Sequence, residues 1–302
     1  GRDRDHTVLM PILDESEAVY SEISIKNRQR RGTGDESSQP DGVHPVPEQP
    51  GRDIWEKEIR GVQTDSRAVG EGDVFVCIRG RHSDGHRFAR QAAEAGAVAV
   101  VCEQDSGVPG QILVEDTRAA WAALCRNLYD NPQRALRLVA VTGTSGKTTV
   151  TCLIRDILRA AGKKVGLIGT IQGEIGDMVI PARYTTPDPS QLYAMLARMR
   201  AAGVEYVVME ASSQALEQRR LDGLHFEAAA FTNLSHEHLD YHETMENYYE
   251  AKRSLFSMAE RAVIVIDDEY SRRLRTEIPC PVTTVSVSDA AADFTAHSVS
   301  FS

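Results

Sequence analysis

The segment Leu136-Arg-Leu-Val-Ala-Val-Thr-Gly-Thr-Ser-Gly-Lys-Thr-Thr149 decides the fold. An apolar run ends at Val141, a glycine-rich turn follows, and helical spacing then continues from Lys147 to Ala161, just before Gly162. A strand that enters a helix through such a turn can cradle phosphates. Glycines let backbone N–H groups approach the anion, and the helix N-terminus adds partial positive charge. The segment therefore predicts a nucleotide site.

The residues of this loop have separate expected roles. Lys147 is expected to reach the terminal phosphates of the nucleotide, and the Thr148 hydroxyl to bind Mg²⁺. Val141 stands where the usual pattern has its first glycine, so the loop is a shortened variant. The alternative is a plain glycine turn before a helix. The candidate nucleotide-binding residues are Gly143, Thr144, Ser145, Gly146, Lys147, Thr148 and Thr149.

Strands and helices alternate on both sides of the loop, which predicts an α/β protein with a mostly parallel sheet. Apolar runs predict strands at 73–78, 97–101, 111–114, 136–141, 165–168, 206–209, 228–231 and 262–266. Helical spacing predicts helices at 88–95, 117–129, 147–161, 190–202 and 245–258.

Three regions follow from this pattern. Residues 1–52 are expected to form a flexible tail, because residues 23–52 are rich in Arg, Gln, Gly, Ser, Pro and Asp and show almost no apolar periodicity. A small α/β domain is expected over 53–134. A P-loop domain with a mostly parallel sheet is expected over 135–302.

Composition limits the class of protein. The chain has 302 residues, with 34 Lys and Arg against 44 Asp and Glu, for a formal charge of −10. This acidity argues against a nucleic-acid partner, which needs a basic surface. No apolar run is long enough to span a membrane. Five scattered cysteines without CxxC spacing indicate reduced thiols. We therefore expect a soluble, cytoplasmic protein.

Polar residues after the later strands are further candidates. Glu210 ends a strand and is expected to face the ligand crevice as a second Mg²⁺ ligand, with a helix N-cap as the alternative. Arg219 and Arg220 are either an anion-binding fork or a surface pair. His238 and His242 are either zinc ligands one helical turn apart or polar loop residues. Lys252 alone would be assigned to a solvated helix face.

The chain resembles the Mur ligase family over roughly two-thirds of its length, from Thr64 to about Tyr270. Within the family it is most similar to the members that add the third amino acid of the peptidoglycan peptide. The motifs that carry the resemblance are Thr64-Asp-Ser-Arg67, Gly72-Asp-Val-Phe-Val76, Asp84-Gly-His86, Val141-Thr-Gly-Thr-Ser-Gly-Lys-Thr-Thr149, Tyr184-Thr-Thr-Pro-Asp188, Met209-Glu-Ala-Ser-Ser-Gln-Ala-Leu216, Asn233-Leu234, His238-Leu-Asp-Tyr-His242 and Tyr249-Glu-Ala-Lys252.

The resemblance implies roles for individual residues. Thr148 and Glu210 would hold one Mg²⁺ against ATP, and His238 would help to hold a second. Lys252 matches the lysine that the family carbamylates with CO₂, and the carbamate would be a metal ligand. Lys147, His238 and Lys252 would be the catalytic residues. The domain over 53–134 would be the UDP-substrate domain. The residues that would bind the substrate are Ser66 at the UDP end, and Thr185, Thr186, Ser212, Gln218 and Arg220 at the muramoyl-peptide end.

The implied activity is ATP-dependent ligation of an amino acid, diaminopimelate or else L-lysine, to UDP-N-acetylmuramoyl-L-alanyl-D-glutamate in peptidoglycan synthesis. An acyl phosphate would be the intermediate. The family also has a C-terminal domain, which we expect this chain to lack. Gln214, Glu237 and Val265 depart from the usual residues of the family.

Two alternatives stay open. One is a non-catalytic Mur-like module or inactive fragment that binds the UDP-muramoyl precursor. The other is a folate-type polyglutamyl ligase, which the Asp65-Ser66-Arg67 block disfavours.

Overall fold

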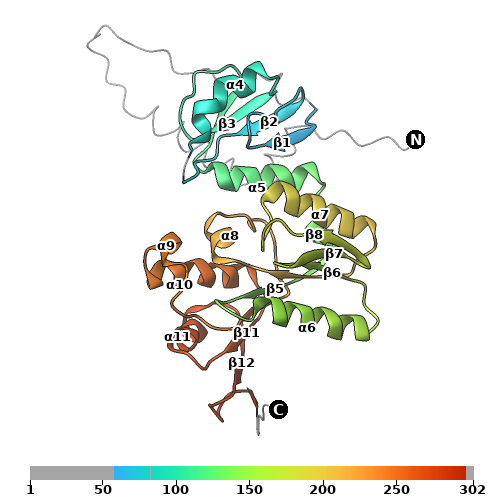
Figure 1. The fold of residues 1–302 in the computed structure, drawn as a ribbon, viewed down its shortest axis with the longest axis vertical. Coiled ribbons are helices and arrows are strands. Elements are labelled where there is room, and N and C mark those ends of the chain that lie inside the picture. Colours follow the sequence, from blue (N-terminus) through green and yellow to red (C-terminus); the bar gives the residue numbers. More distant parts are fainter. Residues whose placement is uncertain (1–57, 82, 297–302) are drawn as a thin grey trace, which may run out of the picture. The chain divides into compact units, whose positions relative to one another are not determined.

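The computed structural model describes residues 58–81 and 83–296, and the expected tail over residues 1–52 lies outside them. The described chain divides into two compact units, which meet in the sequence between Asp130 and Asn131. Both units alternate strands with helices (Figure 1), so the α/β fold expected from the sequence is confirmed. No described helix is both long enough and apolar enough to cross a lipid bilayer.

The described part of the first unit has a four-stranded parallel sheet in the order β1-β2-β3-β4. Every residue of β2 and β3 is buried, as the strands of a sheet covered on both faces should be. Asp116 caps the helix α5 by accepting the N–H groups of Arg118 and Ala119. The elements are β1 (Gly61–Gln63), β2 (Asp73–Val76), η1 (Gly85–Phe88), α4 (Ala89–Glu94), β3 (Ala99–Cys102), β4 (Gln111–Leu113) and α5 (Thr117–Leu128).

The second unit has a nine-stranded sheet in the order β13-β12-β11-β10-β5-β9-β6-β7-β8. Pairing is parallel from β13 to β6, whereas β6 with β7 and β7 with β8 pair antiparallel. The mostly parallel sheet is therefore confirmed. The strands are β5 (Arg137–Thr142), β6 (Val165–Ile168), β7 (Gln172–Ile175), β8 (Met178–Pro181), β9 (Tyr206–Glu210), β10 (Ala228–Phe231), β11 (Ala262–Val265), β12 (Val282–Ser286) and β13 (Phe294–Thr295).

Helices cover both faces of this sheet. Helix α6 packs on β5, β6 and β9, and α7, α8 and α10 lie on the opposite side (Figure 1). Polar N-caps begin several of them, because a side-chain oxygen satisfies N–H groups that the first turn leaves free. The helical elements are η2 (Pro132–Ala135), α6 (Lys147–Ala160), α7 (Pro189–Ala201), α8 (Ser213–Glu217), α9 (Leu239–His242), α10 (Met245–Arg253), η3 (Ser254–Met258) and α11 (Glu269–Glu277).

The structure adds elements that the sequence patterns did not predict: β1, the β7–β8 hairpin, α8, α9, α11, β12 and β13. It also corrects one helix. The segment 245–258 is not one helix, because α10 ends at Arg253 and a 3-10 turn follows.

Candidate active site

Three parallel strands bring the candidate residues to one edge of the sheet. Val141 of β5 is in register with Glu210 of β9 and with Ala230 of β10. The phosphate loop, the Glu210 carboxylate and the segment after Phe231 therefore leave the sheet side by side. This edge, formed by the carboxyl ends of the strands, is where α/β proteins bind their ligands.

The phosphate loop is held in its shape by the segment after β10. The Asn233 side chain accepts the Ser145 N–H at 3.1 Å and donates to the Ser145 carbonyl at 3.2 Å. The Thr144 N–H donates to the Asn233 carbonyl at 2.9 Å. Gly143 (φ +144°) and Gly146 (φ +86°) adopt positive φ values that other residues adopt at a cost. Contacts within the protein thus fix the shape of the loop.

Two lysines converge on this loop. Nζ of Lys147 and Nζ of Lys252 both donate to the Gly143 carbonyl oxygen, at 2.9 and 2.8 Å. Burial lowers the pKa of Lys147, and burial together with the charge of Lys147 holds the pKa of Lys252 well below its usual range. Lys252 is only 1% exposed. Its assignment to a solvated helix face is therefore wrong, and the paired lysines form a site that an anion would stabilise.

Glu210 is buried among hydrogen-bond donors from two other segments. Its carboxylate accepts the Thr148 hydroxyl at 3.0 Å, and the N–H and hydroxyl of Thr170 at 2.8 and 3.0 Å. Ser212, rather than Glu210, caps α8, so the N-cap alternative is wrong. Thr148 and Glu210 offer hydroxyl and carboxylate oxygens, the ligand type that Mg²⁺ prefers, and the pair fits that ion. Thr170 is a site residue that no sequence pattern indicated.

The histidines surround a buried tyrosine. The Tyr248 ring has His238 edge-on at 5.9 Å and His242 stacked at 4.9 Å. Nε2 of His242 is 2.8 Å from the Ser213 hydroxyl, and His238 has φ +57°, in the left-handed region. Within residues 58–81 and 83–296, no three His, Cys, Asp or Glu side chains are placed to hold a metal together.

The residues expected to bind the substrate peptide form a second hydrogen-bonded group beside Glu210. Thr186 donates its hydroxyl to the Glu210 carbonyl at 2.8 Å and accepts the Ser212 N–H at 3.0 Å. The Arg220 guanidinium donates to the Thr186 carbonyl, at 2.8 Å, and to Oε1 of Gln218. Arg219 binds Asp222 instead, at 2.6 Å. The two arginines therefore do not form one fork.

A cavity of about 560 Å³ in the second unit joins these groups. The expected site residues that line it are Thr144, Gly146, Lys147, Thr148, Thr185, Thr186, Glu210, Ser212, Arg220, His238 and Lys252. Gly143 and Ser145 belong to the loop, exposed Thr149 lies in the first turn of α6, and Gln218 holds Arg220. Ser66 belongs to the first unit, where its hydroxyl donates to Gln91 at 3.1 Å.

Two family models match the chain. Residues 141–302 match the Mur ligase middle domain, and residues 58–136 match the Mur ligase family catalytic domain. A solved structure of a UDP-N-acetylmuramoyl-L-alanyl-D-glutamate–2,6-diaminopimelate ligase is similar to this chain at a TM-score of 0.72 and 32% identity. The similarity covers 83% of this chain and 52% of that one.

Curated relatives carry the same enzyme name. The ligase of Caldanaerobacter subterraneus subsp. tengcongensis is 46% identical over 238 residues, which cover 78% of this chain and 49% of the relative. That of Listeria monocytogenes is 42% identical over 253 residues, covering 80% and 51%. The chain thus spans about half the length of the curated relatives it matches. The middle-domain model alone matches more than half of the chain, and the chain belongs to the Mur ligase family.

Proposed function

We propose that this chain carries the nucleotide and peptide sites of an ATP-dependent ligase that adds an amino acid to UDP-N-acetylmuramoyl-L-alanyl-D-glutamate. The observation that carries the proposal is one cavity that joins a lysine-lined phosphate loop to Glu210 and to a polar wall containing Arg220. The names of relatives that are 41–46% identical support the substrate and favour diaminopimelate as the added amino acid.

The nucleotide half of the cavity suits Mg·ATP. Lys147 would bind the terminal phosphates, while Thr148 and Glu210 would hold one Mg²⁺ and His238 a second. When bound, the ions would neutralise the negative charge that develops during phosphoryl transfer. Thr170 would keep the Glu210 carboxylate turned toward the cavity, since it donates two hydrogen bonds to that group.

Lys252 fits a metal site only in a modified form, because an ammonium group repels cations. Its pKa is held well below the usual range by burial, so more of its amine is neutral and nucleophilic than in an ordinary lysine. We propose that this neutral amine adds CO₂ and releases a proton, and that the resulting carbamate would be an anionic ligand. The lowered pKa supports this assignment.

The peptide half of the cavity would orient the substrate. Arg220, Thr186 and Ser212 would bind the peptide end, with Thr185 beside them and Gln218 fixing Arg220. The D-glutamate carboxylate would attack the γ-phosphate of ATP, releasing ADP and forming an acyl phosphate. The amine of the added amino acid would then displace phosphate and lose a proton, giving the amide.

The two units would bind different parts of the substrates. We propose that residues 53–134 bind the UDP end of the substrate, with Ser66 as one contact, and that residues 135–302 bind the nucleotide and the peptide. The proposed reaction uses metabolites of the cytoplasm, and it calls for neither a nucleic-acid nor a membrane partner.

The test is a reaction of the purified chain with Mg·ATP, the UDP-muramoyl dipeptide and either diaminopimelate or lysine. Phosphate release and the mass of the product are then measured. We expect an amide product with diaminopimelate, which Lys147→Met abolishes. Lys163→Met is the matched control, because Lys163 is half-exposed beyond the end of α6 and pairs with Glu205. Binding of the precursor without turnover would indicate a binding module. If neither precursor nor nucleotide binds, the proposal is wrong.

A further inference from the structure

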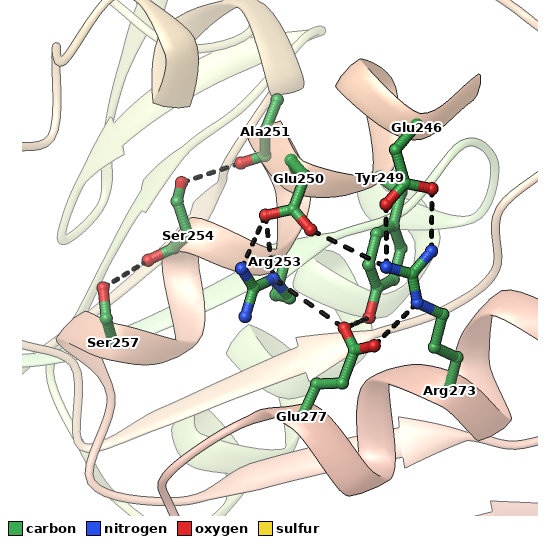
Figure 2. A network of polar contacts seen from close by, with 9 residues as sticks. All are labelled: Glu246, Tyr249, Glu250, Ala251, Arg253, Ser254, Ser257, Arg273 and Glu277. Atoms are coloured by element: carbon green, nitrogen blue, oxygen red, sulfur yellow. Dashed lines mark hydrogen bonds and ion pairs between the residues drawn. The ribbon is translucent and has the colours of Figure 1, made fainter. Parts of the chain in front are cut away.

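Two adjacent tyrosines on α10 contact different parts of the protein. Tyr248 and Tyr249 are both fully buried. Tyr248 lines the active-site cavity, whereas Tyr249 faces α11, where its hydroxyl donates to Glu277 at 2.7 Å. Figure 2 shows the polar network around Tyr249, in which Arg273 lies over its ring, 4.3 Å from the centroid. Tyr249 thus anchors α10 to α11, and Tyr248 is directed at the site.

The hydroxyl of Tyr248 reaches the phosphate loop. It lies 3.2 Å from the hydroxyl oxygen of Thr144. Thr144 in turn accepts the Ser235 N–H at 3.0 Å and lies 3.4 Å from the Ser235 carbonyl. Because the Thr144 hydroxyl can direct its own proton to the Ser235 carbonyl, the phenol hydroxyl can donate to Thr144. This hydrogen bond therefore joins α10 to the loop.

The ring of Tyr248 contacts the other catalytic candidates. Nζ of Lys252 lies 4.6 Å from the ring centroid, and His238 packs edge-on against the same ring. Lys252 also donates to Gly143, which lies 109 positions earlier in the sequence. The relative placement of Lys252 and the loop thus depends on contacts between distant segments, and Tyr248 touches both.

We propose that Tyr248 is a positioning residue that holds Lys252 and His238 at a fixed distance from the phosphate loop. The proposal rests on the proposed function, because it assigns these groups to nucleotide chemistry. The rigid phenol spans the gap with two rotatable bonds, so it loses little conformational freedom. Displacements of about 1 Å at reacting groups cost large factors in rate, which is why such a spacer would matter.

The first arm of the test removes only hydroxyl groups. Binding of Mg·ADP is measured by calorimetry for Tyr248→Phe and for the matched control Tyr249→Phe. We expect about five- to tenfold weaker binding for Tyr248→Phe, the factor that one buried hydrogen bond is worth, and no change for Tyr249→Phe. Thr144→Val should weaken binding as well, but its effect should not add to that of Tyr248→Phe, since both variants delete the same hydrogen bond.

The second arm tests the ring and does not need nucleotide binding. Labelling of Lys252 by an amine-reactive reagent is followed by mass spectrometry in Tyr248→Leu and Tyr249→Leu. We expect labelling at least about fivefold faster in Tyr248→Leu, where the ring that packs over the amine is lost, and a rate near that of the unaltered chain in Tyr249→Leu.

The outcomes separate the two proposals. If the unaltered chain does not bind Mg·ADP, the nucleotide part of the proposed function is contradicted, and the labelling arm still decides the role of Tyr248. Equal effects of the paired variants in labelling would mean that α10 merely loosens, and would overturn the proposal. Additive effects of Thr144→Val and Tyr248→Phe on nucleotide binding would overturn it too.

Discussion

Gly143 should be the least replaceable residue of the phosphate loop. Its φ is +144°, and a Cβ atom there would lie 1.9 Å from the Thr232 hydroxyl oxygen and 3.1 Å from the backbone N and O of Asn233. The Thr232 hydroxyl could move aside, but the backbone of Asn233 is fixed by its hydrogen bond to the Thr144 N–H. Gly143→Ala must therefore shift the loop itself.

The expected cost has two parts. Forcing an alanine into a conformation that essentially only glycine adopts costs about 1–3 kcal/mol. Displacing Thr232 removes its 2.6 Å hydrogen bond to the Ser145 carbonyl, worth about 1 kcal/mol. The sum is about 2–4 kcal/mol. Gly203→Ala is the control, because Gly203 also has a positive φ (+71°) but has open space where its Cβ would lie, so it should lose about 1 kcal/mol.

Urea unfolding of both variants measures these losses, and calorimetry with Mg·ADP measures the effect on the site. We expect Gly143→Ala to weaken nucleotide binding and Gly203→Ala to leave it unchanged. Adding Thr232→Ala to Gly143→Ala should cost less than the sum of the two single changes, since the alanine methyl then meets no hydroxyl. Equal loss of stability in Gly143→Ala and Gly203→Ala, with nucleotide binding retained, would refute the reasoning.

Three further predictions concern buried charge. Glu210→Gln keeps the shape of the side chain and removes its charge. Calorimetry should therefore show Mg·ADP binding about tenfold weaker and metal-free ADP binding unchanged. Equal losses of affinity for Mg·ADP and for metal-free ADP would exclude a metal role for Glu210. Folding stability should rise with pH between the lowered pKa of Lys252 and its ordinary value of 10.5, because the unfolded chain there binds a proton that the folded one does not. Lys252→Met should flatten that rise in urea unfolding, and an unaltered slope would contradict the burial argument. Glu174→Gln should cost about 2 kcal/mol of unfolding free energy, because the buried carboxylate pairs with Arg155 and Arg159 at 2.7 and 2.8 Å; exposed Asp156→Asn is the control, and equal losses would mean that the buried pairing adds nothing.

The sequence specified elements wherever one signal was strong and local. The strand ending at the phosphate loop, the helix beginning at Lys147 and the strand 228–231 stand as their patterns predicted. The β7–β8 hairpin was missed because its strands are short and β8 is almost wholly exposed, which leaves no alternating apolar pattern. The boundary at Arg253 was missed because the 3-10 turn 254–258 continues the apolar spacing of a helix.

The loop motif by itself predicted a phosphate site, since glycines, a lysine and a threonine between a strand and a helix form the usual pattern of one. The family motifs then indicated Glu210, His238 and Lys252. Only the tertiary structure decided how these groups meet. A lysine such as Lys252 is expected at the surface from its residue type alone, but it is buried in the fold. Parallel pairing of β5 and β10 brings α10 over the loop. Thr170 and Tyr248 carry no local signal, since their roles arise from contacts with residues 40 and 104 positions away. Such contacts are fixed by the register of the sheet, and a short stretch of sequence does not encode them.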